Sequence, residues 1–77
     1  MPSILIGMKE VIGSNVYDAR TDRGVTQEAL AERVGVSRQT IIAIEKGNYV
    51  PSVLLALKIA GFFGRSVEDV FYIERRK

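Results

Sequence analysis

The sequence predicts an all-α fold of five short helices. Residues 26–47 have the pattern of two short helices joined by a tight turn at Gly35-Val36-Ser37, where glycine can supply the positive φ that such a turn needs. Residues 53–63 repeat apolar side chains at helical spacing. A glycine follows four of the five predicted helices, and glycine ends a helix at little steric cost. We expect residues 1–77 to form one domain, because a chain of 77 residues encloses one modest core.

The first 13 residues allow two assignments. Ser3–Gly7 is short, rich in β-forming residues and closed by glycine, which favours an edge strand followed by a turn or linking segment. Residues 8–12 would instead begin a helix. Gly13-Ser14-Asn15 interrupts either structure, so residues 1–13 are expected to form an N-terminal extension or strand.

Capping residues delimit the first two helices. Ser14 or Asn15 caps a helix that we expect to extend to Arg23, because short polar side chains accept hydrogen bonds from the free N–H groups of a first turn. Thr26 opens the second helix in the same way, and this helix is expected to run to about Val34.

Serines open the three remaining helices. Ser37 begins a helix that is expected to end near Lys46, and Ser52 caps the helix over residues 53–63. Ser66, with an aspartate three residues later, resembles a capping box at the start of a short fifth helix.

A helix, a glycine turn and a second helix at this spacing form a helix-turn-helix, the unit that places its second helix in the DNA major groove. The net charge of +2 is too small to indicate nucleic-acid binding alone. The distribution of charge fits DNA binding better than the net charge does, because residues 1–36 carry a net charge of −1 and residues 37–77 one of +3. Ordinary solvated charges are the alternative interpretation. Residues 72–77 form the C-terminal tail, and its last three residues, Arg75-Arg76-Lys77, are a basic end that we expect to be mobile.

The composition argues against several other classes of protein. The sequence has no cysteine and no histidine, which removes thiolate chemistry and the commonest general base and metal ligand. We therefore expect no metal, no cofactor, no small-molecule ligand and no enzymatic activity. The apolar stretches are too short to span a membrane, and the N-terminus lacks the basic region of a signal peptide. A cytoplasmic location is the remaining expectation.

Several separately spaced motifs carry a family resemblance. They are Gly24-Val25-Thr26-Gln27, Leu30-Ala31, Gly35-Val36-Ser37, Thr40-Ile41, Ile44-Glu45-Lys46-Gly47, Pro51-Ser52 and residues 55–60. With these motifs, residues 14–71 resemble the Cro/CI-type (XRE) helix-turn-helix family of prokaryotic and phage transcriptional regulators. The resemblance implies a five-helix, lambda-repressor-like domain that binds double-stranded DNA at a specific palindromic operator and acts as a repressor.

The resemblance also implies roles for individual residues. Those that match base-contacting positions of the recognition helix are Ser37, Arg38, Gln39, Ile42 and Ala43. Those that match phosphate-contacting positions are Gln27, Thr40, Lys46, Asn48 and Tyr49, with backbone N–H groups of the loop at 46–49 also contributing. Arg20 and Glu45 match an ion pair that ties the first helix to the end of the recognition helix.

One departure from the family pattern affects the predicted base readout. Ile42 and Ala43 are apolar where many relatives carry polar residues, so they offer only shape or contact with a thymine methyl group. The polar readout then falls to Arg38 and Gln39, because arginine can donate two hydrogen bonds to guanine and glutamine can pair with adenine. The alternative is that both are ordinary solvent-exposed residues.

Surplus apolar residues predict a homodimer. The interface candidates are Leu54, Leu57, Phe62, Tyr72 and Ile73. One small domain has little room to bury all of them, although core packing with scattered surface apolar residues is the alternative. Helix-turn-helix proteins usually bind as two-fold dimers.

Two further expectations come from the resemblance. In some small relatives the terminal segments pair as a small β-sheet near the dimer contact, which makes Ser3–Gly7 and Phe71–Glu74 the expected partners here. Antitoxins and bridging co-activators also resemble this family, so the alternative role is an interaction protein whose main partner is another protein.

Overall fold

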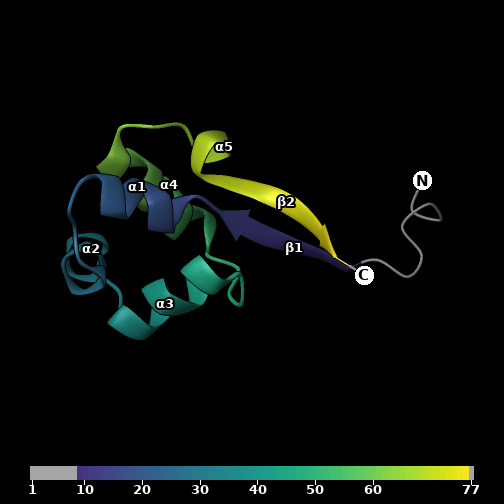
Figure 1. Cartoon of the computed structure of the whole chain (residues 1–77), viewed down its shortest axis with the longest axis horizontal. Coiled ribbons are helices and arrows are strands. Elements are labelled where there is room, and N and C mark those ends of the chain that lie inside the picture. The colour runs from purple at the N-terminus through teal and green to yellow at the C-terminus, as the bar shows by residue number, and fades with distance from the viewer. Residues whose placement is uncertain (1–8, 77) are drawn as a thin grey trace.

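The computed structural model describes residues 9–76. In chain order the elements are β1 (Lys9–Ser14), α1 (Val16–Asp22), α2 (Gln27–Val34), α3 (Arg38–Lys46), α4 (Val53–Phe63), α5 (Val67–Val70) and β2 (Phe71–Arg76). Figure 1 shows the helices gathered at one end of the molecule and the two strands projecting from them as a ribbon. Among the described helices, none is long and apolar enough to cross a membrane. The mostly helical fold with five helices is confirmed.

Local capping sets the starts of α2 to α5, as the sequence predicts. The side chains of Thr26, Ser37, Ser52 and Ser66 each accept a hydrogen bond from the backbone N–H three residues later. Each bond satisfies one of the donors that a helix start leaves free. The glycines that follow α1 to α4 all have φ between +66° and +80°, so these ends use the left-handed conformation that glycine adopts without strain.

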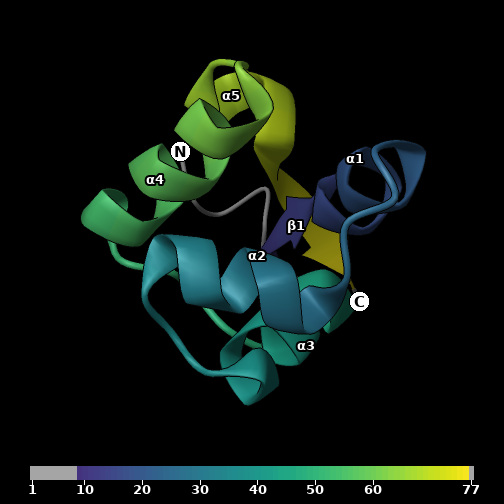
Figure 2. The ribbon, with the colours of Figure 1, turned by 90° about the vertical axis from the view of Figure 1, so that its left-hand side faces the viewer.

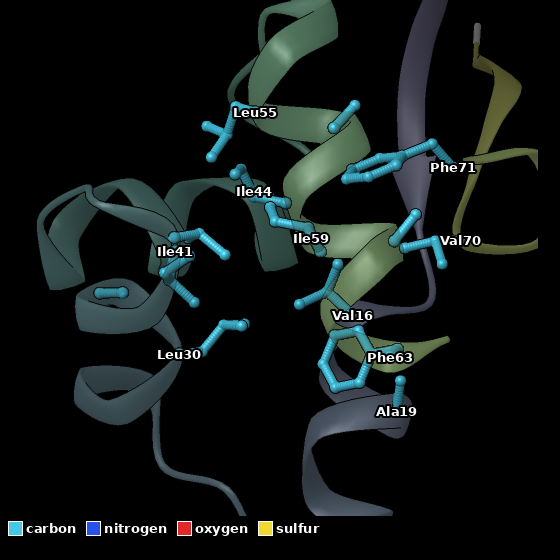
Figure 3. Close-up of a cluster of buried hydrophobic side chains, with 14 residues drawn as sticks. Val16, Ala19, Leu30, Ile41, Ile44, Leu55, Ile59, Phe63, Val70 and Phe71 are labelled. Carbon is cyan, nitrogen blue, oxygen red and sulfur yellow. The ribbon is translucent and has the colours of Figure 1, made fainter. Parts of the chain in front are cut away.

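A single apolar core joins all five helices. Figure 3 shows Leu30 of α2 and Ile41 of α3 facing Ile59 and Phe63 of α4, with Val16 of α1 beside them. The buried set is Val16, Ala19, Leu30, Ala31, Val34, Ile41, Ile44, Leu55, Ala56, Ile59, Ala60, Phe63, Val70 and Phe71. Figure 2 shows α2 and α3 packed together below α4 and α5. The core therefore fixes α3 through its inner face and leaves its outer face available.

The two ends of the described chain pair as an antiparallel ribbon. Register places Ile12 opposite Ile73, Gly13 opposite Tyr72 and Ser14 opposite Phe71. A Cβ at Gly13 would lie 2.4 Å from Cε1 of Tyr72, so the absence of a side chain at Gly13 lets the tyrosine ring lie across the strand. The predicted strand at Phe71–Glu74 is confirmed and extends two residues further.

Two of the three predictions for the chain ends need correction. The expected strand at Ser3–Gly7 lies outside the described residues, while the segment from Lys9 to Ser14, expected to be a linking segment and a helix start, is the strand that pairs. The expected mobile tail is instead strand β2 as far as Arg76. Inter-strand hydrogen bonds to a distant segment order both stretches, and local sequence carries little trace of such pairing.

The start of α1 also differs in detail. Asn15 is the N-terminal cap residue, but its side chain makes no capping hydrogen bond. Its Nδ2 instead donates to the carbonyl oxygen of Asp69 at 3.1 Å, and its backbone N–H donates to the carbonyl of Val70 at 2.8 Å. Asn15 therefore connects the start of α1 to α5, at the point where the ribbon leaves the helices.

Candidate DNA-binding interface

The outer face of α3 presents the predicted base-contacting residues in two groups. Ser37, Arg38 and Gln39 are exposed at its N-terminal end, whereas Ile42 and Ala43, one turn further, are half-buried. The oxygen of Ser37 already accepts the capping hydrogen bond from the N–H of Thr40 at 3.2 Å. Arg38 and Gln39 are therefore the long polar side chains that this end of the helix offers to a ligand.

A buried ion pair fixes the C-terminal end of α3. Nε of Arg20 on α1 donates to Oε2 of Glu45 at 2.7 Å, and its Nη2 donates to Oε1 at 3.2 Å. The third nitrogen, Nη1, donates to the carbonyl oxygen of Val25 at 2.9 Å. Both side chains are about nine-tenths buried, so the predicted pair has the bidentate geometry that makes arginine–carboxylate contacts specific.

Glu45 raises the pKa of Arg20 above its ordinary value, mainly through the hydrogen bonds that it accepts, while burial acts in the opposite direction. A cation whose pKa is raised on folding contributes stability below its unfolded pKa and loses it as pH rises through the folded value. Because arginine already titrates far above neutral pH, the Arg20 charge is present throughout the physiological range.

Gln27 extends this ion pair to the N-terminal end of α3. Its Nε2 donates to Oε1 of Glu45 at 3.0 Å, and its Oε1 accepts a hydrogen bond from Nε of Arg38 at 3.3 Å. The same Nε lies 3.8 Å from Oε2 of Glu28. Sequence reasoning did not single out Glu28, although its place beside Gln27 in the first turn of α2 was visible.

The network orients Arg38 without using its whole guanidinium group. The contacts to Gln27 and Glu28 both involve Nε, and the arginine side chain remains 54% exposed. Nη1 and Nη2 lie outside these two contacts. They are a pair of parallel donors of the kind that recognises two acceptors on a guanine edge.

The predicted phosphate-contacting residues fall into two groups at opposite ends of α3. Gln27 and Thr40 are half-buried near its start, and Lys46, Asn48 and Tyr49 are exposed at its end. The resemblance also implies phosphate contacts from backbone N–H groups of the loop at 46–49, and two of these groups have partners within the protein. The N–H of Gly47 donates to the carbonyl of Ile44 and that of Asn48 to the carbonyl of Ala43, in the pattern of a helix C-terminus.

The predicted interface candidates are mostly exposed. Leu54, Leu57, Tyr72 and Ile73 each expose 44–64% of their surface. Phe62 differs, because it packs on the core and carries the guanidinium of Arg33 5.2 Å above its ring.

The structure adds apolar residues that sequence reasoning did not single out. Val50 and Val53 are 71% and 76% exposed. They border an apolar hollow of about 170 Å³, together with Ile12, Pro51, Ala56, Val67 and Phe71. The position of the valines beside Pro51, in the loop and first turn of α4, was the available signal.

Comparison with known proteins assigns the family. A family model described as Helix-turn-helix (HTH_3) matches residues 16–70. The chain belongs to the XRE-type helix-turn-helix family. Accordingly, it is a transcriptional regulator with a helix-turn-helix DNA-binding domain, as the sequence predicts.

Curated relatives of this XRE-type chain carry matching descriptions. The chain is 56% identical over 61 residues to the uncharacterized HTH-type transcriptional regulator YgzD of Bacillus subtilis, covering 79% of this chain and 92% of that protein. It is 62% identical over 55 residues to the similar regulator MJ0272 of Methanocaldococcus jannaschii, covering 71% and 83%. The cryptic phage CTXphi transcriptional repressor RstR of Vibrio cholerae is 32% identical over 60 residues, with 78% and 54% covered.

Solved structures of helix-turn-helix regulators share the fold. The restriction-modification controller protein C.AhdI of Aeromonas hydrophila aligns with a TM-score of 0.65 at 28% identity, covering 70% of this chain and 82% of that protein. The clp gene regulator ClgR of Corynebacterium glutamicum aligns with a TM-score of 0.65 at 33% identity, covering 70% and 57%.

Proposed function

We propose that the protein regulates transcription by placing α3 in the major groove of a palindromic operator as a homodimer. The observation that carries this proposal is the exposed N-terminal end of α3, where Gln27 orients Arg38 and leaves two guanidinium nitrogens outside the network. In the proposed complex Arg38 donates to a guanine and Gln39 pairs with an adenine. Ser37, Ile42 and Ala43 supply close contact along the groove.

Phosphate contacts set the register of this helix in the proposal. Gln27 and Thr40 approach the DNA backbone near the start of α3. Near the end of α3, the residues that approach the DNA backbone are Lys46, Asn48 and Tyr49. These contacts carry affinity and orientation, whereas the base contacts carry sequence preference. Each correct bidentate base contact is expected to be worth about 1–3 kcal/mol of discrimination.

The proposed type of regulation is repression. The proposed location is the cytoplasm, where the DNA lies. The supporting relative is the repressor RstR, at 32% identity. A helix in the major groove of a promoter blocks transcription by occupancy alone, without catalysis. A non-enzymatic role also agrees with a sequence that has no histidine and no cysteine, because such a chain lacks the commonest groups for general-base and thiolate chemistry.

Exposed apolar side chains support the proposed homodimer. Leu54 and Leu57 lie on the outer face of α4, and Ile73 lies on the ribbon face that also carries Ile12. Burying such groups in an interface removes apolar surface from water, which favours association. A two-fold dimer would place two recognition helices about 34 Å apart, on successive turns of one face of the DNA.

Selection of bound duplexes from a random pool tests the DNA-binding proposal. The expected result is a palindrome whose half-sites are centred about 10 base pairs apart, with a guanine and an adenine preferred in each half-site. A pool without enrichment, at any salt concentration that permits binding, would contradict sequence-specific recognition.

Sedimentation of two variants tests the homodimer. The double variant Leu54→Gln/Leu57→Gln is expected to shift the protein toward monomer, whereas Tyr17→Gln, at an equally exposed apolar position on α1, should sediment as the parent does. A parent that is monomeric at high concentration would contradict the dimer. The same exposed side chains would then favour the alternative role, in which another protein covers them, and co-purification would identify that protein.

A further inference from the structure

The two faces of the β ribbon differ in their charge pairing. On one face Glu10 lies opposite Arg75, and these side chains form an ion pair with Nε and Oε2 3.4 Å apart. On the other face Lys9 lies opposite Arg76, so two cations face each other across the strands. Like charges at directly opposed positions destabilise a ribbon, and on this face Glu74 offsets the repulsion in part, with its Oε1 3.2 Å from Nη2 of Arg76.

The Lys9/Arg76 face adjoins the C-terminal end of α3. A Cβ placed on Gly47 would lie 2.9 Å from Nη2 of Arg76, which brings the guanidinium against the residue that ends the recognition helix. A small polar hollow lies between the ribbon and this helix end, and Lys46, Tyr72 and Arg76 are among its lining residues. Figure 1 shows the ribbon extending away from the helices beyond this end of α3.

We propose that Lys9 and Arg76 bind DNA phosphates next to those reached by Lys46 and the loop that follows it, so that the ribbon lengthens the contact with the backbone. The inference rests on the proposed placement of α3 in the major groove. A helix end that lies at the phosphates brings with it the guanidinium packed against Gly47, and Lys9 stands directly across the strands from that arginine.

Glu74 leaves Arg76 able to exchange partners. Nη2 of Arg76 lies 3.2 Å from Oε1 of Glu74, but the two side chains remain 45% and 40% exposed. Exposed ion pairs of this kind contribute little and are screened by salt. A phosphate can therefore replace the carboxylate at the guanidinium without leaving a buried charge unpaired.

The salt dependence of DNA binding tests this inference with matched variants. For Lys9→Gln and Arg76→Gln, the magnitude of the slope of log K against log salt concentration is expected to fall by about 1 each, and by about 2 in the double variant. With each phosphate contact that is lost, fewer counterions are released when the protein binds DNA. Arg75→Gln removes the same charge from the opposite face of the same strand. Its slope should equal that of the parent.

A second pair of variants adds a test that does not depend on removing Arg76. Glu74→Gln frees Arg76 and should tighten binding up to about fivefold, whereas Glu10→Gln changes the net charge equally on the opposite face and should not. Thermal melts verify folding for every variant. Inorganic phosphate is added as a competitor. A site that binds only free phosphate would be occupied by the competitor to the same extent whichever duplex is present.

The outcomes separate this inference from the proposed function. Parent-like slopes for Lys9→Gln and Arg76→Gln, while the parent binds its selected operator, would overturn the ribbon contact and leave the role of α3 intact. An equal loss in the Arg75→Gln control would also overturn it, since general charge would then explain the effect. Loss of sequence preference in Arg38 variants remains the separate measure of α3 recognition.

Discussion

Arg20 and Glu45 form a bidentate ion pair, with Nε and Oε2 2.7 Å apart, that links α1 to the last turn of α3, the proposed recognition helix. Gln27 carries the contact on to Arg38. One buried charge pair therefore connects the structural support of α3 to the side chain proposed to contact a base.

Arg20→Ala is expected to destabilise the fold more than it weakens DNA contact directly. Removing one partner of a buried pair leaves the other charge uncompensated, at a cost of about 3–5 kcal/mol, which lowers the melting temperature of a domain this size by about 12 °C or more. Calorimetry checks the melting temperature, with the exposed Arg65→Ala as control. Equal melting temperatures for Arg20→Ala and the parent would rule the prediction out.

Arg38→Lys should keep affinity for DNA in general but lose preference at one base pair of each half-site. Lysine retains the charge, whereas only the planar guanidinium presents two parallel donors. We expect a loss of about 1–3 kcal/mol in discrimination at that position, with an unchanged salt slope. Binding to a set of single-base operator variants measures it. Unaltered preference at every position would show that Arg38 contacts no base.

Gln27→Glu is expected to destabilise the fold more than Gln27→Ala does. The glutamate would place a second carboxylate against Oε1 of Glu45, which now accepts a hydrogen bond from Nε2 of Gln27 at 3.0 Å, and like charges at this distance repel. The melting temperatures of the two variants measure this difference in stability. Gln27→Ala should weaken binding to all sequences similarly, since it releases Arg38 and removes a proposed phosphate contact. A more stable Gln27→Glu variant would contradict the network.

Gly35→Ala and Gly61→Ala should have opposite effects on stability. Gly35 has φ of +80° in the turn between α2 and α3, where alanine costs about 1–2 kcal/mol. Gly61 lies within α4, and a Cβ there meets nothing within 4 Å, so alanine stabilises the helix by up to about 1 kcal/mol. Urea unfolding of both variants measures whether each substitution raises or lowers the free energy of unfolding. Destabilisation by Gly61→Ala would refute this account of α4.

The sequence by itself determined the features that depend on neighbours a few residues away. Ser37 accepts its hydrogen bond from the N–H of Thr40, so capping predicted where α3 begins. Gly35 and Gly47 end helices through their own φ angles, and periodic apolar positions such as Ile59 predicted the buried core. The helix-turn-helix follows from the spacing of these local signals, whereas the family came from a resemblance that the family comparison confirmed.

Only the tertiary structure decided the features that join distant segments. The pairing of β1 with β2 brings Lys9 opposite Arg76, and neither strand predicts its partner alone because hydrogen bonding and register depend on both. The link from Gln27 to Glu45 and Arg38 likewise depends on how α2 packs against α3. The predicted Arg20–Glu45 pair came from the family pattern, but its burial and its connection to Arg38 required the folded chain.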